Sequence, residues 1–158
     1  MRTYLLNVSV ILTIFWSSCD PNRIYEKNQD FIFKYWHKDS IASFQFEIQD
    51  PTASYNLYYN IRNTASYPYH NLYVTYYLED SLGRTVISEL DEMFLFNAKT
   101  GKSLGKGLGD IFDYQIPVLE AYQFNAKGEY TFKVQQFMRM DSLPEILSIG
   151  LRVEKIQP

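Results

Sequence analysis

The sequence predicts an all-β fold, a single antiparallel β-sandwich. Aromatic residues, which are enriched in strands, make up 17% of the 158 residues. About six to eight short segments alternate apolar with polar side chains, and turn residues separate them. No long segment has the period of an amphipathic helix. The 46% of hydrophobic residues is typical of one packed domain.

The clearest alternation lies in residues 55–79. Residues 55–62 place Tyr, Leu, Tyr and Ile on one face, and residues 72–79 repeat the pattern with Leu, Val, Tyr and Leu. The intervening NTASYPYH is too long for a two-residue hairpin turn, and Pro68 cannot donate to a strand ladder. We expect a loop here, and we expect the two strands to pair as the centre of a sheet.

Further strands follow from the same alternation and from short apolar runs. The expected segments are 43–49, 84–88, 93–96, 111–118, 130–135 and 146–155, with 31–36 as an edge strand or an extended cover and 120–124 as a helical turn or a loop. We expect four residues to share the buried inner face: Phe46, Leu57, Val74 and Phe132. Lys133 then points to the opposite face of its strand.

The N-terminus predicts a lipoprotein signal peptide. Arg2 precedes the apolar stretch LLNVSVILTIFW at residues 5–16, and the small residues Ser17 and Ser18 stand directly before Cys19. This arrangement resembles the lipobox of bacterial lipoproteins, in which the cysteine is acylated and becomes the first mature residue. A transmembrane anchor is one alternative, although the stretch is shorter than the roughly 18 residues that span a bilayer. An ordinary cleaved signal with a stray cysteine is the other.

The chain then divides into three parts. We expect residues 1–18 to be removed as the signal peptide, residues 19–30 to form a lipidated polar tether, and residues 31–158 to form the β-sandwich domain. Cys19 is the only cysteine, so no disulfide can form within the chain. These features predict a lipid-anchored membrane protein of the cell envelope that faces the periplasm, with inner and outer membrane both open.

Charge and motifs argue against several classes of function. The net charge is −3 and no long basic run occurs, which disfavours nucleic acid as a partner. The glycine-rich segment 101–109 lacks the first glycine of a P-loop, because Phe96 stands in its place. The segment fits a connection in which glycines permit positive φ or close backbone approach.

Residue sets for catalysis or metal binding do not emerge from the sequence either. His37 and His70 fall in loops or at strand ends, and His37 with Asp39 gives only two neighbouring metal ligands. Asp110 and Asp113 beside the glycines suit calcium, but solvated loop acids are far commoner. We therefore expect a protein that is not an enzyme, with no catalytic residues, no metal and no cofactor.

The loop between the two tyrosine-rich strands is the candidate partner-binding region. Tyr67 and Tyr69 lie in it, and tyrosine is enriched in binding hot spots. The alternative is that both rings fold back and cap the end of the sandwich. Arg62, Asn63 and Asn71 have side chains suited to hydrogen bonds with loop backbone, so we expect them to position the loop.

Several segments together resemble the gliding motility-associated lipoprotein family called GldH. They are Cys19 after the signal, YNLYYNIRNTASYPYHNLYV at 55–74, GKSLGKGLGDIFD at 101–113, GEYTFKVQQFMRMD at 128–141 and IGLRVEK at 149–155. The resemblance covers nearly the whole mature chain. It implies a non-catalytic membrane lipoprotein that is needed for movement over surfaces and acts with other gliding proteins and the associated protein secretion apparatus.

A carbohydrate-binding β-sandwich lipoprotein is the alternative function. Flat aromatic faces stack on sugars, and the candidates for such contacts are Trp36, Tyr67, Tyr69 and Tyr73. Core packing accounts for most aromatic residues more simply. We therefore rank carbohydrate binding second.

Overall fold

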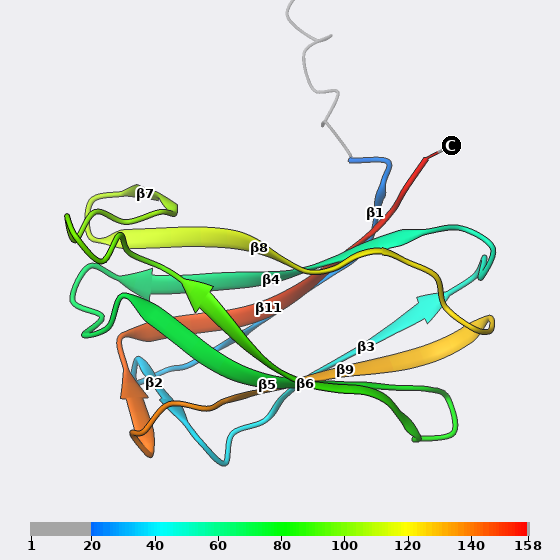
Figure 1. Ribbon diagram of the computed structural model, residues 1–158, viewed down its shortest axis with the longest axis horizontal. Helices are drawn as coiled ribbons and strands as arrows, with labels where there is room; N and C mark the ends of the chain where they lie inside the picture. Colours follow the sequence, from blue (N-terminus) through cyan, green and yellow to red (C-terminus); the bar gives the residue numbers. More distant parts are fainter. Residues whose placement is uncertain (1–19, 158) are drawn as a thin grey trace, which may run out of the picture.

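The computed structural model describes residues 20–157 as two antiparallel β-sheets packed face to face (Figure 1). The first sheet has the strand order β1-β11-β4-β8-β7. Its strands are β1 (Arg23–Asp30), β11 (Ile146–Lys155), β4 (Tyr55–Thr64), β8 (Ile111–Tyr122) and β7 (Lys106–Leu108). Each neighbouring pair is antiparallel. The predicted all-β fold is confirmed.

The second sheet has the strand order β3-β9-β5-β6. Its strands are β3 (Ala42–Ile48), β9 (Gly128–Gln136), β5 (Asn71–Glu79) and β6 (Thr85–Phe94). A separate short pair, β2 (Tyr35–His37) with β10 (Ser142–Pro144), lies beside one end of the sheets (Figure 1). Residues 20–157 contain no helix of the length and apolarity that crossing a membrane requires.

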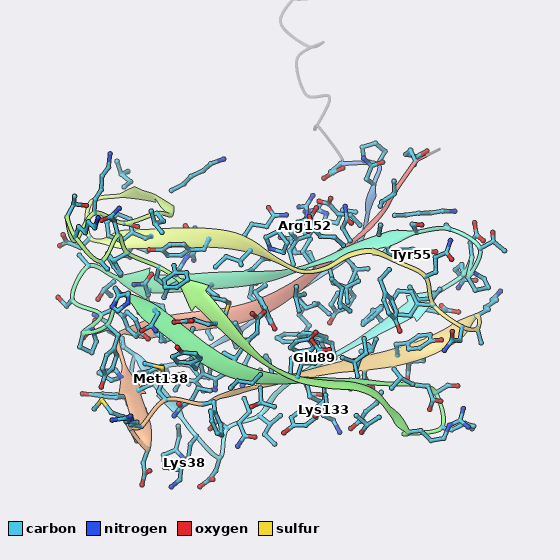
Figure 2. All side chains as sticks on the ribbon, viewed as in Figure 1. Lys38, Tyr55, Glu89, Lys133, Met138 and Arg152 are labelled. Carbon is cyan, nitrogen blue, oxygen red and sulfur yellow. The ribbon has the colours of Figure 1, made fainter. Side chains whose placement is uncertain are left out.

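The core lies between the sheets and is built from alternate residues of facing strands. The four predicted core residues are all buried in it: Phe46, Leu57, Val74 and Phe132. The Phe132 ring stacks on Tyr76 of its own sheet at a centroid distance of 5.5 Å and contacts Tyr59 of the facing sheet at 5.9 Å. Lys133 points outward instead and pairs with Glu79 at 2.8 Å (Figure 2).

The two tyrosine-rich strands do not pair with each other, so the prediction of a central pair is wrong. β4 lies between β11 and β8 in the first sheet, whereas β5 lies between β9 and β6 in the second. They face each other across the core, where the rings of Tyr59 and Tyr76 are 6.3 Å apart. Alternation fixes which face of a strand is buried but does not fix its neighbours. The long connecting loop crosses the roughly 10 Å between the packed sheets.

Most of the segment predicted as a tether, residues 19–30, belongs to the folded domain. Residues 23–30 form β1, which pairs with β11. The strand is polar because it lies at the edge of the sheet with most of its side chains in water. Its one aromatic residue, Tyr25, turns inward, and its ring lies 5.8 Å from that of Phe46. The first strand of the domain therefore begins at Arg23, ahead of residue 31. Cys19 and the predicted signal peptide lie outside the described residues.

Strand β6 unites two segments that the sequence separates. Most of the predicted strand 84–88 and the first half of the predicted strand 93–96 belong to one strand, Thr85–Phe94, which runs through Glu89, Asp91 and Glu92. Similarly, residues 120–122 continue β8 instead of forming a helical turn. In β6 the acidic residues Glu89 and Asp91 lie on the inner face and break the expected alternation. In β8 the alternation is broken by register shifts against residues 55–58 of β4.

The two ends of the sandwich can be named from the hydrogen bonds of the chain termini. The carbonyls of Asn22 and Ser54 accept hydrogen bonds from the backbone N–H groups of Lys155 and Ile156, at 2.8 and 2.9 Å. We call this end proximal, and it includes the turns 50–54, 80–84 and 123–127. The opposite, distal end carries the segments 31–34, 63–70, 95–105 and 109–110, at the left of Figure 1.

Candidate functional site

Loop 63–70 is fixed at the distal end by hydrogen bonds to two other segments. Thr64 donates from its backbone N–H to the Glu145 carbonyl at 3.0 Å and from its hydroxyl to the Glu145 carboxylate at 2.5 Å. The N–H of Ala65 donates to the Asp110 carbonyl at 2.8 Å. The N–H of Ser66 donates to the Thr64 hydroxyl at 3.2 Å. The loop therefore has one defined shape, held between the turns before β11 and before β8.

Tyr67 packs inside this loop, and that corrects its assignment as a contact residue. Its side chain is only 5% exposed and stacks on Phe96 at 6.5 Å. Its hydroxyl donates to the Asn71 carbonyl at 2.9 Å, and burial, with Tyr69 nearby, raises the pKa of Tyr67. Tyr69 meets Tyr67 edge-on at 5.8 Å and keeps part of its surface exposed. Of the two candidate contact residues, only Tyr69 is accessible to a partner.

The three residues expected to position the loop have different roles. Arg62 lies on the outer face of the first sheet, where its Nε donates to Asp113 at 2.6 Å; this ion pair raises the pKa of Arg62. Asn63 is buried and donates from its amide to the following loop carbonyl at 2.9 Å. Asn71 donates from its amide to Glu92 of β6 at 2.6 Å. Arg62 therefore does not hold the loop, and the Asn71 side chain holds β6.

Matched hydroxyl deletions can test the structural role of Tyr67. We expect Tyr67→Phe to lower the free energy of unfolding by about 1 kcal/mol, because the Asn71 carbonyl loses its donor. Tyr69→Phe should leave it nearly unchanged, because the Tyr69 hydroxyl has no hydrogen-bond partner within residues 20–157. Urea unfolding of both variants measures the difference. Equal losses would mean that the Tyr67 hydroxyl does not brace the loop.

Several large apolar side chains are exposed at the distal end, and the sequence did not single them out. These distal apolar residues are Ile32, Phe33, Phe94, Leu104 and Leu108. Leu108 at the tip of β7 is 95% exposed. For Leu104 and Leu108, the sequence signal for exposure is an apolar residue within a glycine-rich segment. Exposed apolar side chains on several loops suit contact with another protein.

The glycine-rich segment presents Leu104 and Leu108 at the surface, and its backbone lies very close to β8. A Cβ atom at Gly107 would lie 2.2 Å from the Ile111 carbonyl oxygen, and one at Gly105 would lie 2.7 Å from the Tyr114 ring. Glycine is therefore required for β7 to pair with β8. The close approach expected from the sequence occurs at these two positions.

A hollow of about 650 Å³ borders the outer face of the first sheet. Its polar side chains bind one another: Asn60 donates to Glu26 at 2.9 Å, and Arg62 pairs with Asp113. Paired groups of this kind stabilise a surface and are poorly placed to act as a general acid or base. The hollow therefore does not resemble a catalytic site.

The acids and histidines considered as metal ligands are dispersed. His37 and Asp39 are 3.5 Å apart but both are exposed, and Asp113 is occupied by Arg62. No group of three or more potential ligands gathers anywhere in residues 20–157. Two ligands do not make a protein metal site.

The aromatic residues considered for carbohydrate binding do not form a platform. Trp36 is fully buried, and its indole N–H donates to the Ser40 carbonyl at 2.8 Å. Tyr67 is buried as described above, while Tyr69 and Tyr73 are half-buried on different segments. Two of the four proposed stacking faces are therefore closed to a sugar.

The comparisons with known proteins agree along almost the whole domain. A family model described as GldH lipoprotein matches residues 23–153. A gliding motility lipoprotein GldH homolog from Christiangramia forsetii is 31% identical over 155 residues, covering 94% of this chain and 93% of that protein. The gliding motility lipoprotein GldH of Flavobacterium johnsoniae is 28% identical over 162 residues, covering 98% and 99%.

A solved structure of infectious bursal disease virus, Gx strain, is also similar to this chain. It has a TM-score of 0.43 and 14% sequence identity, and the match covers 85% of this chain and 32% of the viral chain. A TM-score below 0.5 carries no conclusion about function.

Proposed function

The chain belongs to the GldH lipoprotein family, and from this premise we propose that it is a non-catalytic component of the gliding motility machinery and its associated protein secretion, acting through protein–protein contacts. As a gliding motility lipoprotein it belongs to the cell envelope and is anchored to a membrane. The lipid on Cys19 is the proposed anchor, and the domain faces the periplasm. The partners are other proteins of the machinery.

The observation that carries this proposal is the position of Asp20, the residue after Cys19, relative to the distal apolar residues. Asp20 forms an ion pair with Arg152 of β11. Arg152 also pairs with Glu26 at 3.2 Å and Glu154 at 2.5 Å, so Asp20 is part of the folded domain. A lipid on Cys19 would therefore hold the sandwich against the membrane surface.

Such an anchor leaves the distal end free for partners. The ten residues of β4 run between the two ends, and strands of that length span about 33 Å. Exposed Leu108, Leu104 and Phe33 would then lie well away from the lipid, on loops set on a rigid scaffold. Contacts made there would join the membrane-held domain to another component.

Two leucine substitutions at opposite ends test the contact surface. We expect Leu108→Ser at the distal end to lower gliding speed and secretion strongly, because a hot-spot residue contributes about 2 kcal/mol or more to binding. Leu82→Ser is the matched control, since Leu82 lies in the proximal turn and is 73% exposed. Gliding of cells that depend on each variant is the measurement, with membrane levels and thermal midpoints checked in parallel. Unimpaired gliding with Leu108→Ser, or equal loss with Leu82→Ser, would contradict a distal contact surface.

A further inference from the structure

One flank of the sandwich is open because both sheets end there in long unpaired edges. β6 is the last strand of the second sheet and pairs only with β5, while β7 covers β8 only at residues 111–113. On the other flank β1 packs on β3, where the rings of Tyr25 and Phe46 are 5.8 Å apart. Between the flanks, β4 packs on β5. The strand orders therefore place β8 over β6, as Figure 1 shows. We call β6 and residues 114–122 of β8 the open flank.

Strand β6 turns two carboxylates toward the interior of this flank. Glu89 and Asp91 lie opposite Tyr76 and Val74 in the register with β5, and both of those are core residues. Figure 2 places Glu89 between the two sheets. Glu89 accepts a hydrogen bond from the Tyr76 hydroxyl at 3.0 Å, but neither carboxylate has an ion-pair partner among residues 20–157. Partial burial raises the pKa of Asp91.

Tyr59 places a buried hydroxyl beside this acidic pair. Its side chain is fully buried on β4, and its hydroxyl lies near the Asp91 carboxylate without a hydrogen bond of good geometry in the described part of the chain. Burial raises the pKa of Tyr59, and the nearby charges of Asp91 and Glu89 raise it further. The cluster thus presents two carboxylates that have no cationic partner among residues 20–157 to a ligand that enters from the flank.

The edge of β6 is otherwise well suited to pair with another strand. It runs for ten residues, contains no proline or lysine, and keeps a regular register with β5 from position 87 to position 94. Its outer face exposes Val86, Leu90 and Phe94. Long, regular edges pair readily with other strands unless a feature of the edge opposes pairing, and inward-pointing charges are one such feature. The two carboxylates therefore select which strand can be added.

The acidic residues of β6 also exclude a second copy of this chain as the added strand. Two β6 strands paired about a two-fold axis would bring Glu89, Asp91 and Glu92 of one copy close to the same residues of the other. Like charges on opposite strands destabilise a sheet. Residues 85–94 contain no basic residue that could offset this repulsion.

We propose that β6 is the docking edge for an extended segment of a different polypeptide, which adds to the second sheet as a fifth strand and places lysine or arginine side chains beside Glu89 and Asp91. Main-chain hydrogen bonds to the β6 edge supply affinity, and the alternate side chains supply specificity. The inward residues of the segment are basic, and its outward residues are apolar because they lie beside Val86 and Leu90. The site is separate from the distal end and does not depend on the lipid.

Synthetic peptides and hydrogen exchange test this docking edge on the full-length protein in detergent micelles. The probe is the peptide Thr-Val-Lys-Val-Lys-Val-Thr, which carries both lysines on one face of a strand. We expect it to slow amide exchange in residues 85–94 and to leave β1, the edge of the other sheet, unchanged. The double variant Glu89→Gln/Asp91→Asn should bind it about tenfold or more weakly, because charge-assisted hydrogen bonds are lost. Glu129→Gln, at an exposed position of β9, is the control and should bind as the parent does.

Two further peptides keep the proposal falsifiable if the double variant fails to fold. Replacing both lysines by glutamate should abolish binding to the unaltered protein, and N-methylation of alternate backbone amides should do the same by removing strand donors. Tight binding of either control peptide would overturn the proposal. So would slowed exchange on another strand, self-association through β6, or no binding of the lysine peptide at roughly 150 mM salt, where surface attraction is screened.

Discussion

Replacing Phe132 by alanine is expected to lower the free energy of unfolding by about 3–5 kcal/mol. Phe132 is fully buried at the centre of the second sheet. Its ring lies against Tyr76 and Tyr59, so truncation leaves a cavity bordered by both sheets. Large aromatic rings on both sides cannot collapse fully into that space, and the lost contacts add to the lost burial.

The neighbouring residue provides the control for this measurement. Lys133 lies on the opposite face of the same strand and is partly exposed, with Glu79 as its ion-pair partner. Exposed pairs contribute little, so Lys133→Ala should change stability by about 0.5 kcal/mol or less. Urea unfolding followed by the fluorescence of buried Trp36 reports both variants. Equal effects would mean that the inner and outer faces of β9 are assigned the wrong way round.

The buried face of each strand could be predicted from the sequence, but the neighbours of each strand could not. Leu57 and Val74 are buried as the alternation requires, yet their strands lie in different sheets. A period of two reports burial on one face and carries no information on pairing. The choice between a hairpin and a crossing loop depends on the hydrogen bonds of Thr64 and Ala65 to distant segments, which the sequence does not reveal.

Edge strands were the other source of error, for a related reason. β1 and β6 each have one side in water, so their side chains do not follow a simple apolar and polar alternation. β1 therefore has the composition of a tether, and Glu89, Asp91 and Glu92 break the alternation within β6. Those same residues supply the carboxylates of the open flank, so the departure from the pattern marks a feature with a proposed function.

The burial of Tyr67 is a feature of the candidate contact region that the sequence does not reveal. Its residue type suits a contact surface, but its side chain is buried against Phe96. Leu108 stands in a segment that was interpreted only through its glycines. Gly107 is what lets β7 lie on β8 and hold Leu108 in water, so the glycine and the exposed leucine are parts of one local structure.

Replacing Cys19 by serine is expected to abolish labelling by a clickable palmitate analogue and to release the chain from membranes. The chain has one cysteine, so no other thiol can accept the lipid. The alkyl stretch of a lipid anchor contributes about 0.8 kcal/mol per buried CH₂ group, and its loss removes membrane affinity outright. The folded domain offers no replacement, because the residues next to Cys19 are polar and Asp20 is bound to Arg152.

Ser18→Ala is the matched control for this last experiment. It keeps a small residue directly before the cysteine, so processing and labelling should continue, and the domain should remain in the membrane fraction. Membrane fractionation and in-gel fluorescence of the label measure both variants, and urea unfolding checks that Cys19→Ser leaves the sandwich intact. Label retained by Cys19→Ser would show that the lipid is attached elsewhere. Full membrane retention without label would instead assign the anchor to the apolar stretch at residues 5–16, and the proximal end would then no longer be fixed at the lipid surface by acylation.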